Sequence, residues 1–243
     1  MKKYLFWAAV SIGAFSLGLA AFALYYLSII PEVPIPELLT VQKKSGCAKS
    51  KSFPGLSKQI SELKKGKSDY FPQKIWGNDM LPKHSQAGWY GKHLEAMNEK
   101  SLLDSSRESA ETYRFLWLRT FHHPIFVRVE CARTEVKLFT KELDGLGGYA
   151  PGKISRSGEG VLTESEWCEF LRLLDKADFW KMPSENDVLG NDGVQWVLEG
   201  VKENRYHVVD RWTPRDESKY RAACIYLLKL SGVDVDKLKD DLY

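Results

Sequence analysis

The chain has 243 residues, and its 35 lysines and arginines nearly balance its 32 aspartates and glutamates, which gives a net charge of +3. This balance argues against a dedicated nucleic-acid binder, which concentrates basic residues. The length suits one domain, or one domain with a small appendage.

An apolar stretch begins almost at the first residue. No charged side chain occurs from Tyr4 to Ile30, and a helix of that length, at about 1.5 Å per residue, crosses a hydrocarbon core of about 30 Å. Residues 1–30 are therefore predicted to form a single-pass anchor in the inner membrane. The alternative is export after signal cleavage at the pattern Ala21-Phe22-Ala23, although the apolar stretch exceeds the usual signal core of about 7–15 residues.

Lysines set the expected orientation. Lys2 and Lys3 adjoin the apolar stretch, whereas the first lysine after it is Lys43. Because positive charge next to a membrane helix stays in the cytoplasm, the rest of the chain is predicted to lie in the periplasm. In the alternative orientation the domain faces the cytosol, and a basic tether at residues 41–67, with eight lysines and Glu62 as its one acidic residue, binds anionic lipid.

Beyond the apolar stretch, the chain divides into a linker and a domain. Residues 31–52 are rich in proline and lysine and are predicted to be an extended spacer. Residues 53–243 are predicted to form one soluble domain, with residues 113–232 as its core. We find no internal repeat.

Periodicity and turn residues predict the elements of this domain. Short helices are expected at residues 55–65 and 89–103, with an irregular stretch rich in proline and glycine at 70–88 between them. Strands are expected at residues 114–121, 124–131, 134–140, 153–157, 194–201 and 205–212. Longer helices are expected at 164–176, where Thr163 and Glu166 match a capping box, and at 215–230, opened by Pro214. Strands in hairpins with helices grouped between or after them indicate an α+β fold with a mainly antiparallel sheet and two or more packed helices.

Five segments carry a family resemblance. They are YRFLWLRTFHHPIFVRV, LDGLGGYAPG, the FW-x-x-P at residues 179–183, NDGVQWVLEG and YHVVDRWTP. Together they resemble a group of bacterial proteins with no known function, over residues 113–232. The resemblance implies a shared domain, and it transfers no activity and no catalytic residue.

One glycine-rich segment imitates a nucleotide-binding loop. Residues 147–153 satisfy the spacing G-x-x-x-x-G-K, but Ile154 stands where a true phosphate loop has the serine or threonine that binds magnesium. The following residues include Gly158 and Gly160 and do not read as a helix. We therefore interpret the segment as a turn, and expect no nucleotide there.

The candidates for catalysis are three histidines and one aspartate: His122, His123, His207 and Asp210. Adjacent residues of an extended chain face opposite ways, so His122 and His123 are poorly placed to share a metal ion, and a turn histidine is more often structural. Asp210 lies in a predicted strand and needs a partner if it points inward, for which a structural ion pair is the default. The candidate partners are Arg119, Arg128 and Arg221.

The cysteines show no metal-ligand spacing. Cys168 and Cys224 fall in helical apolar patterns and are predicted to be small core residues. A disulfide involving these or Cys47 and Cys131 would fit a domain outside the cytosol, but the spacing assigns no pairing. No metal ion or other cofactor is expected.

The tryptophans divide between core and recognition. Those in periodic elements are predicted to belong to the core: Trp117, Trp167, Trp180, Trp196 and Trp212. Trp76, Trp89 and Tyr90 lie in the irregular stretch or at a helix start, where they either line a groove for a glycan or peptide or cover the core.

These patterns favour a membrane-tethered domain of the bacterial envelope that acts as a binding or assembly module, with a protein or an envelope glycan as its partner. The alternatives are an envelope hydrolase that uses His122, His207 and Asp210, and the cytosol-facing domain with a lipid-binding tether. Convergence of these three residues around a concave pocket would favour the hydrolase.

Overall fold

A computed structural model describes residues 60, 63, 70–72, 75, 86–105, 111–132, 135–186, 190, 192–203, 205–238 and 242. The predicted anchor from Tyr4 to Ile30, the linker at residues 31–52 and Trp76 lie outside these ranges. So does most of the short helix expected at residues 55–65. Within the described ranges, no helix is both long enough and apolar enough to span a membrane.

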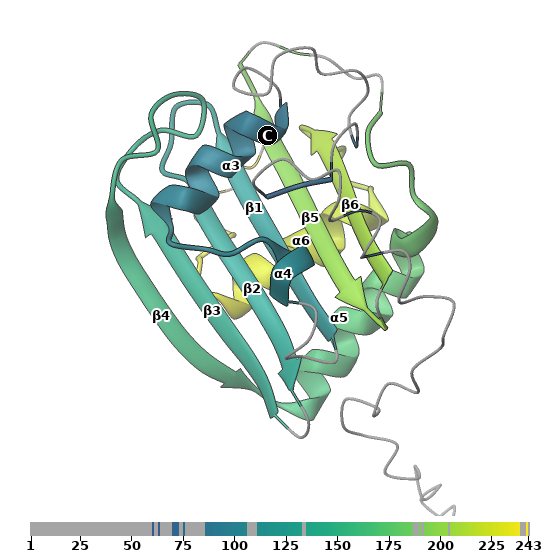
Figure 1. Cartoon of the computed structure of the whole chain (residues 1–243). Helices are drawn as coiled ribbons and strands as arrows, with labels where there is room; N and C mark the ends of the chain where they lie inside the picture. The colour runs from purple at the N-terminus through teal and green to yellow at the C-terminus, as the bar shows by residue number, and fades with distance from the viewer. Residues whose placement is uncertain are drawn as a thin grey trace, which may run out of the picture. The chain divides into compact units, whose positions relative to one another are not determined.

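Six antiparallel strands form one sheet in the order β4-β3-β2-β1-β5-β6 (Figure 1). The strands are β1 (Glu111–Arg119), β2 (Ile125–Ala132), β3 (Glu135–Leu143), β4 (Ile154–Leu162), β5 (Val194–Lys202) and β6 (Arg205–Trp212). The α+β class with a mainly antiparallel sheet is therefore confirmed. All six predicted strands are present, and β4 runs five residues beyond its expected end because it pairs with β3 as far as Leu162.

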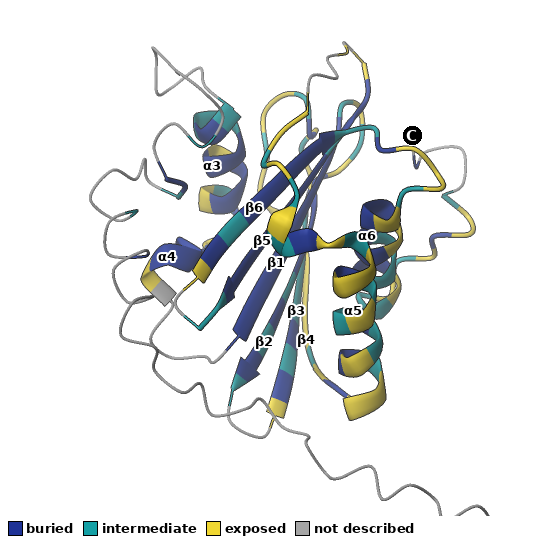
Figure 2. Ribbon diagram, turned by 90° about the vertical axis from the view of Figure 1, so that its right-hand side faces the viewer, coloured by how far each residue is buried: buried dark blue, intermediate teal, exposed yellow. Residues whose placement is uncertain are grey.

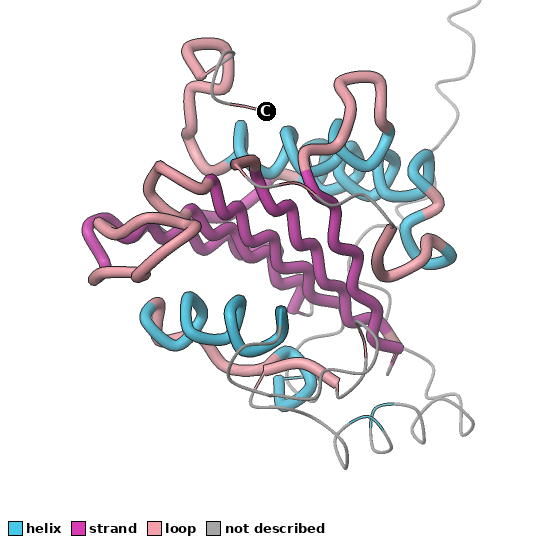
Figure 3. Tube along the Cα trace, turned by 90° about the horizontal axis from the view of Figure 1, so that it is seen from above, coloured by secondary structure: helices cyan, strands magenta, loops and turns pink. Residues whose placement is uncertain are grey.

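Helices cover both faces of the sheet (Figures 2 and 3). One face packs against α5 (Glu164–Ala177), the short turn η1 (Phe179–Lys181) and α6 (Lys219–Leu230). The other face packs against α3 (Gln86–Ala96) and α4 (Leu102–Ser105). The central strand β1 lies between the two layers, and every one of its residues is buried.

Sequence patterns predicted some helix boundaries correctly and others wrongly. The predicted capping box is confirmed, since Thr163 and Glu166 exchange both bonds at the start of α5. The helix expected at 89–103 divides into α3 and α4 around Asn98, whose φ of 53° is left-handed. The last helix begins at Lys219, not at residue 215, because the side chain of Ser218 accepts the Arg221 amide and caps it there.

The buried cores confirm part of the tryptophan and cysteine predictions. Trp117, Trp167 and Trp196 are buried, whereas Trp180 and Trp212 are only half-buried. Cys224 is a buried free thiol, as expected, but Cys168 is exposed, so its assignment to the core was wrong. Cys168 neighbours the buried Trp167 on α5, and a one-residue step turns it about 100° away from the apolar stripe. Cys131, buried in β2, is disulfide-bonded.

Candidate functional site

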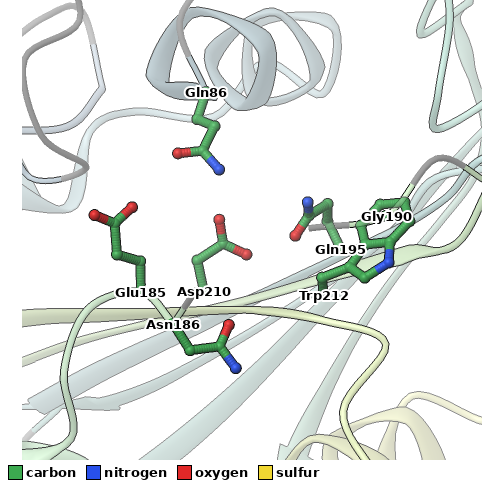
Figure 4. A pocket seen from close by; sticks show the side chains of 7 residues that line it. All are labelled: Gln86, Glu185, Asn186, Gly190, Gln195, Asp210 and Trp212. Atoms are coloured by element: carbon green, nitrogen blue, oxygen red, sulfur yellow. The ribbon is translucent and has the colours of Figure 1, made fainter. Parts of the chain in front are cut away.

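A small polar pocket lies at the start of α3, beside the last residues of β6 (Figure 4). Its volume is about 90 Å³. The residues that line it are Gln86, Glu185, Asn186, Gly190, Gln195, Asp210 and Trp212. Among these described residues the ionisable side chains are two carboxylates, Glu185 and Asp210, which give this lining an acidic character.

Strand pairing brings three of these side chains to one face of the sheet. Gln195 on β5 lies opposite Trp212 on β6, and Val197 lies opposite Asp210. Because opposed residues of antiparallel strands, and residues two apart along a strand, share a face, Gln195, Asp210 and Trp212 all face the α3 layer. Gln86 and Tyr90 lie four apart on α3, which places both on the side of the helix that meets this face.

Asp210 is the most deeply buried polar residue of the pocket, with 4% of its surface exposed. The Tyr90 hydroxyl donates a hydrogen bond of 2.6 Å to its Oδ2 atom. Its Oδ1 atom is buried and has no hydrogen-bond donor among the described residues, and the same holds for Oε1 of Gln195. The expectation that an arginine pairs with Asp210 was wrong: the partner is a neutral phenol on a helix 120 residues away.

Burial dominates the electrostatics of this carboxyl group. The pKa of Asp210 is raised from 3.8 to about 7, chiefly by burial and in smaller part by the nearby charge of Glu185, while the Tyr90 bond and the charge of Arg211 act to lower it. Burial and the neighbouring Asp210 also raise the pKa of Tyr90 well above its ordinary value. Asp210 therefore titrates near neutral pH, while Tyr90 stays protonated and donates its hydrogen bond.

Hydrogen bonds on one side and close packing on the other fix the walls of the pocket. The guanidinium of Arg211 donates to the carbonyl oxygens of Pro183, at 2.7 Å, and of Ser184, at 3.4 Å, which holds the segment leading to Glu185 along the edge of β6. The Asp210 amide donates to the Ser184 carbonyl at 2.7 Å. On the other side Trp212 lies directly against the backbone of Gly190, where an added Cβ would come within 2.1 Å of the indole Nε1.

A second buried polar region, under α3 and α4, has a different character. Glu199 accepts bonds from Arg114 at 2.6 Å and from Tyr206 at 2.8 Å. Glu99 accepts from Arg128 at 3.0 Å and from Lys141. A larger hollow of about 260 Å³ opens beside Glu99, but both buried carboxylates here have cationic partners from the chain itself. Paired in this way, they have the character of structural ion pairs.

The structure does not gather the candidate catalytic residues. His207 and Asp210 differ by three positions on β6 and so project from opposite faces, and the His207 ring packs against Phe179 with centroids 5.1 Å apart. His122 lies in the β1–β2 turn, and exposed His123 lies 3.5 Å from Glu142. The convergence that would favour a hydrolase is therefore not formed.

Of the proposed recognition aromatics, Trp89 and Tyr90 fall within the described residues, and neither lines the pocket. Tyr90 is fully buried behind Asp210. Trp89 is half-buried and packs against Tyr90 and His93, with ring centroids 5.4 and 6.3 Å apart. Most residues of the pocket lining were not predicted from the sequence. One signal was available: Asp210 falls on the same strand face as Tyr206, Val208 and Trp212, so it places a carboxylate on an otherwise apolar or aromatic face.

The glycine-rich loop at residues 147–153 uses its amides within the fold. The Gly147 amide donates to the His122 carbonyl at 2.9 Å, and the Gly148 amide donates to the Thr120 carbonyl at 3.0 Å. A strand, β4, follows Lys153, as predicted, where a phosphate loop would lead into a helix.

No protein-family model matches the chain, and no curated protein matches it. Across the described part of the chain, no three His, Cys, Asp or Glu side chains cluster closely enough to hold a metal ion. The site must therefore be interpreted from its own chemistry.

Proposed function

We propose that this protein is a membrane-tethered binding module of the bacterial envelope, and that its ligand site is the Asp210 pocket. One observation carries the assignment of the site. Two buried acceptors, Oδ1 of Asp210 and Oε1 of Gln195, have no donor among the described residues, although leaving a buried polar atom unsatisfied costs about 1–3 kcal/mol. A pocket that presents unsatisfied acceptors is suited to a ligand that donates hydrogen bonds.

The tether and its orientation rest on the uncharged stretch from Tyr4 to Ile30 and on Lys2 and Lys3 before it. The disulfide at Cys131 supports a periplasmic domain, because disulfides persist in oxidising compartments such as the periplasm and are rare in the cytosol. The placement of the histidines gives no support to the hydrolase alternative.

A ligand screen on the full-length chain in detergent tests the site. The melting temperature is measured with small hydrogen-bond donors of several classes, namely amines, amides, alcohols and short glycans. We expect at least one class to stabilise the wild type and to lose its effect in Asp210→Asn and Gln195→Leu. The proposal fails if no class stabilises the wild type, or if the active class stabilises all three proteins equally.

A further inference from the structure

We infer that the Asp210 pocket binds a primary alkylammonium group, the kind of group that ends a lysine side chain or an aliphatic diamine. The inference deepens the proposed function and rests on it. Charge, hydrogen-bonding capacity, size and the aromatic wall each contribute to it.

Charge is the first constraint on the ligand. Asp210 and Glu185 both line the pocket, and none of the described residues that line it is a lysine, an arginine or a histidine. Arg211, the nearest cation in the sequence, directs its guanidinium to the carbonyls of Pro183, Ser184 and Asp210. A cationic ligand would therefore provide the positive charge that these carboxylates lack, whereas an anion would be repelled by both of them.

Hydrogen-bonding capacity is the second constraint. An ammonium group has three donors and no acceptor. The pocket offers the free oxygens of Asp210 and Gln195, and the carboxylate of Glu185 at its rim. The three donors of an ammonium group therefore have three oxygen-bearing side chains to bind. Figure 4 shows these groups on neighbouring walls, with Gln86 above them.

Size restricts the ligand to a small group. A volume of about 90 Å³ is well below the volume of about 150 Å³ of a cavity that binds benzene, and it accommodates an ammonium group and its nearest methylenes. The rest of the molecule must extend into solvent. Trp212 forms an aromatic wall at which a cation and its methylenes are both favourable neighbours.

A calcium ion fits less well than an ammonium group. Calcium takes about 6–8 oxygen ligands and usually several carboxylates. The described lining supplies two carboxylates, and no cluster of three metal-binding side chains occurs in the described ranges.

Titration calorimetry on the full-length chain in detergent tests the inference with four probes: n-butylammonium, 1-butanol, tetramethylammonium and Ca²⁺. We expect saturable binding of n-butylammonium at pH 8 and at least about tenfold weaker binding by Asp210→Asn. Glu95→Gln removes an exposed carboxylate of α3, the helix that carries Gln86, at a position outside the pocket lining, and should bind like the wild type. Binding by the wild type should weaken about tenfold at pH 6, because protonation of Asp210 removes its charge, and Asp210→Asn should not show this dependence.

The other probes separate failure of the inference from failure of the proposed function. Binding of 1-butanol or tetramethylammonium as tight as that of n-butylammonium would overturn the ammonium assignment, and so would tighter binding of Ca²⁺. If that binding is lost in Asp210→Asn, the pocket remains a ligand site. Absence of Asp210-dependent binding by every probe, together with a negative donor screen, would overturn both.

Discussion

The substitution Asp210→Asn is expected to change how the stability of the domain depends on pH. Asparagine keeps an oxygen that accepts the Tyr90 hydroxyl but does not titrate. In the wild type, burial raises the pKa of Asp210 from 3.8 to about 7. The folded protein therefore holds this proton at pH values where the unfolded chain has released it.

The size of the effect follows from this difference in pKa. At about 1.4 kcal/mol per pH unit, a rise from 3.8 to about 7 corresponds to on the order of 4 kcal/mol. A raised pKa contributes stability that is fully present below about pH 4 and is lost as the pH rises through 7. His93 acts in the opposite direction. Burial lowers its pKa from 6.5 to about 4, so its contribution is lost as the pH falls through the same window, by roughly 3 kcal/mol.

The two groups nearly cancel in the wild type, so the assay must compare two proteins. Urea unfolding of the full-length chain and of Asp210→Asn in detergent, followed by tryptophan fluorescence, gives the free energy of unfolding from pH 4.5 to 8. The variant minus the wild type isolates Asp210, because His93 is common to both. We expect this difference to grow in favour of the variant by a few kcal/mol and to level off above pH 7. A difference that is flat with pH would refute the reasoning, since Asp210 would then titrate alike in the folded and unfolded states.

Three further predictions concern packing, covalent structure and topology. Gly190→Ala should destabilise the domain by about 1–3 kcal/mol in thermal unfolding, since its Cβ would collide with Trp212, whereas Gly160→Ala, with nothing within 4 Å, should lack this collision penalty. Peptide mapping without reduction should recover Cys131 in a disulfide; with the other two described cysteines free, Cys47 is the remaining candidate partner, and its recovery as a free thiol would contradict the pairing. A reporter that is active only outside the cytosol should be active when fused to the C-terminus, and activity of only a cytosolic reporter would favour the lipid-binding alternative.

Local patterns were sufficient to identify the strands, but not every helix boundary. Alternation and β-branched residues identified all six strands, and the Thr163 capping box located the start of α5, because strand faces and helix ends are set by residues close in sequence. The order of the strands in the sheet could not be predicted from these local patterns. β1 pairs with β5 along its full length, which brings together residues about eighty positions apart, and no local pattern encodes that choice.

The site was still less accessible from the sequence, because its parts converge from distant segments. Asp210 was identified as a residue that needs a partner, but its partner Tyr90 lies 120 positions earlier on a different element. Glutamine and asparagine side chains such as Gln86, Gln195 and Asn186 carry no distinctive spacing in the sequence. They line one pocket only because the fold brings their segments together.

The contrast between the two buried acidic regions supports the assignment of Asp210 to binding. At Glu199, the chain supplies Arg114 within 2.6 Å, so the charge is neutralised when the protein folds. At Asp210, the chain supplies a phenol and turns its nearest guanidinium toward backbone carbonyls. Ionisation of this buried carboxylate then weakens the folded state near neutral pH, and the hydrogen bond from Tyr90 offsets only part of that loss. Such local conflicts between sequence and stability are expected at functional sites. A bound cation would stabilise the ionised form of Asp210. The free energy that the folded state regains in this way would contribute to the affinity for the ligand.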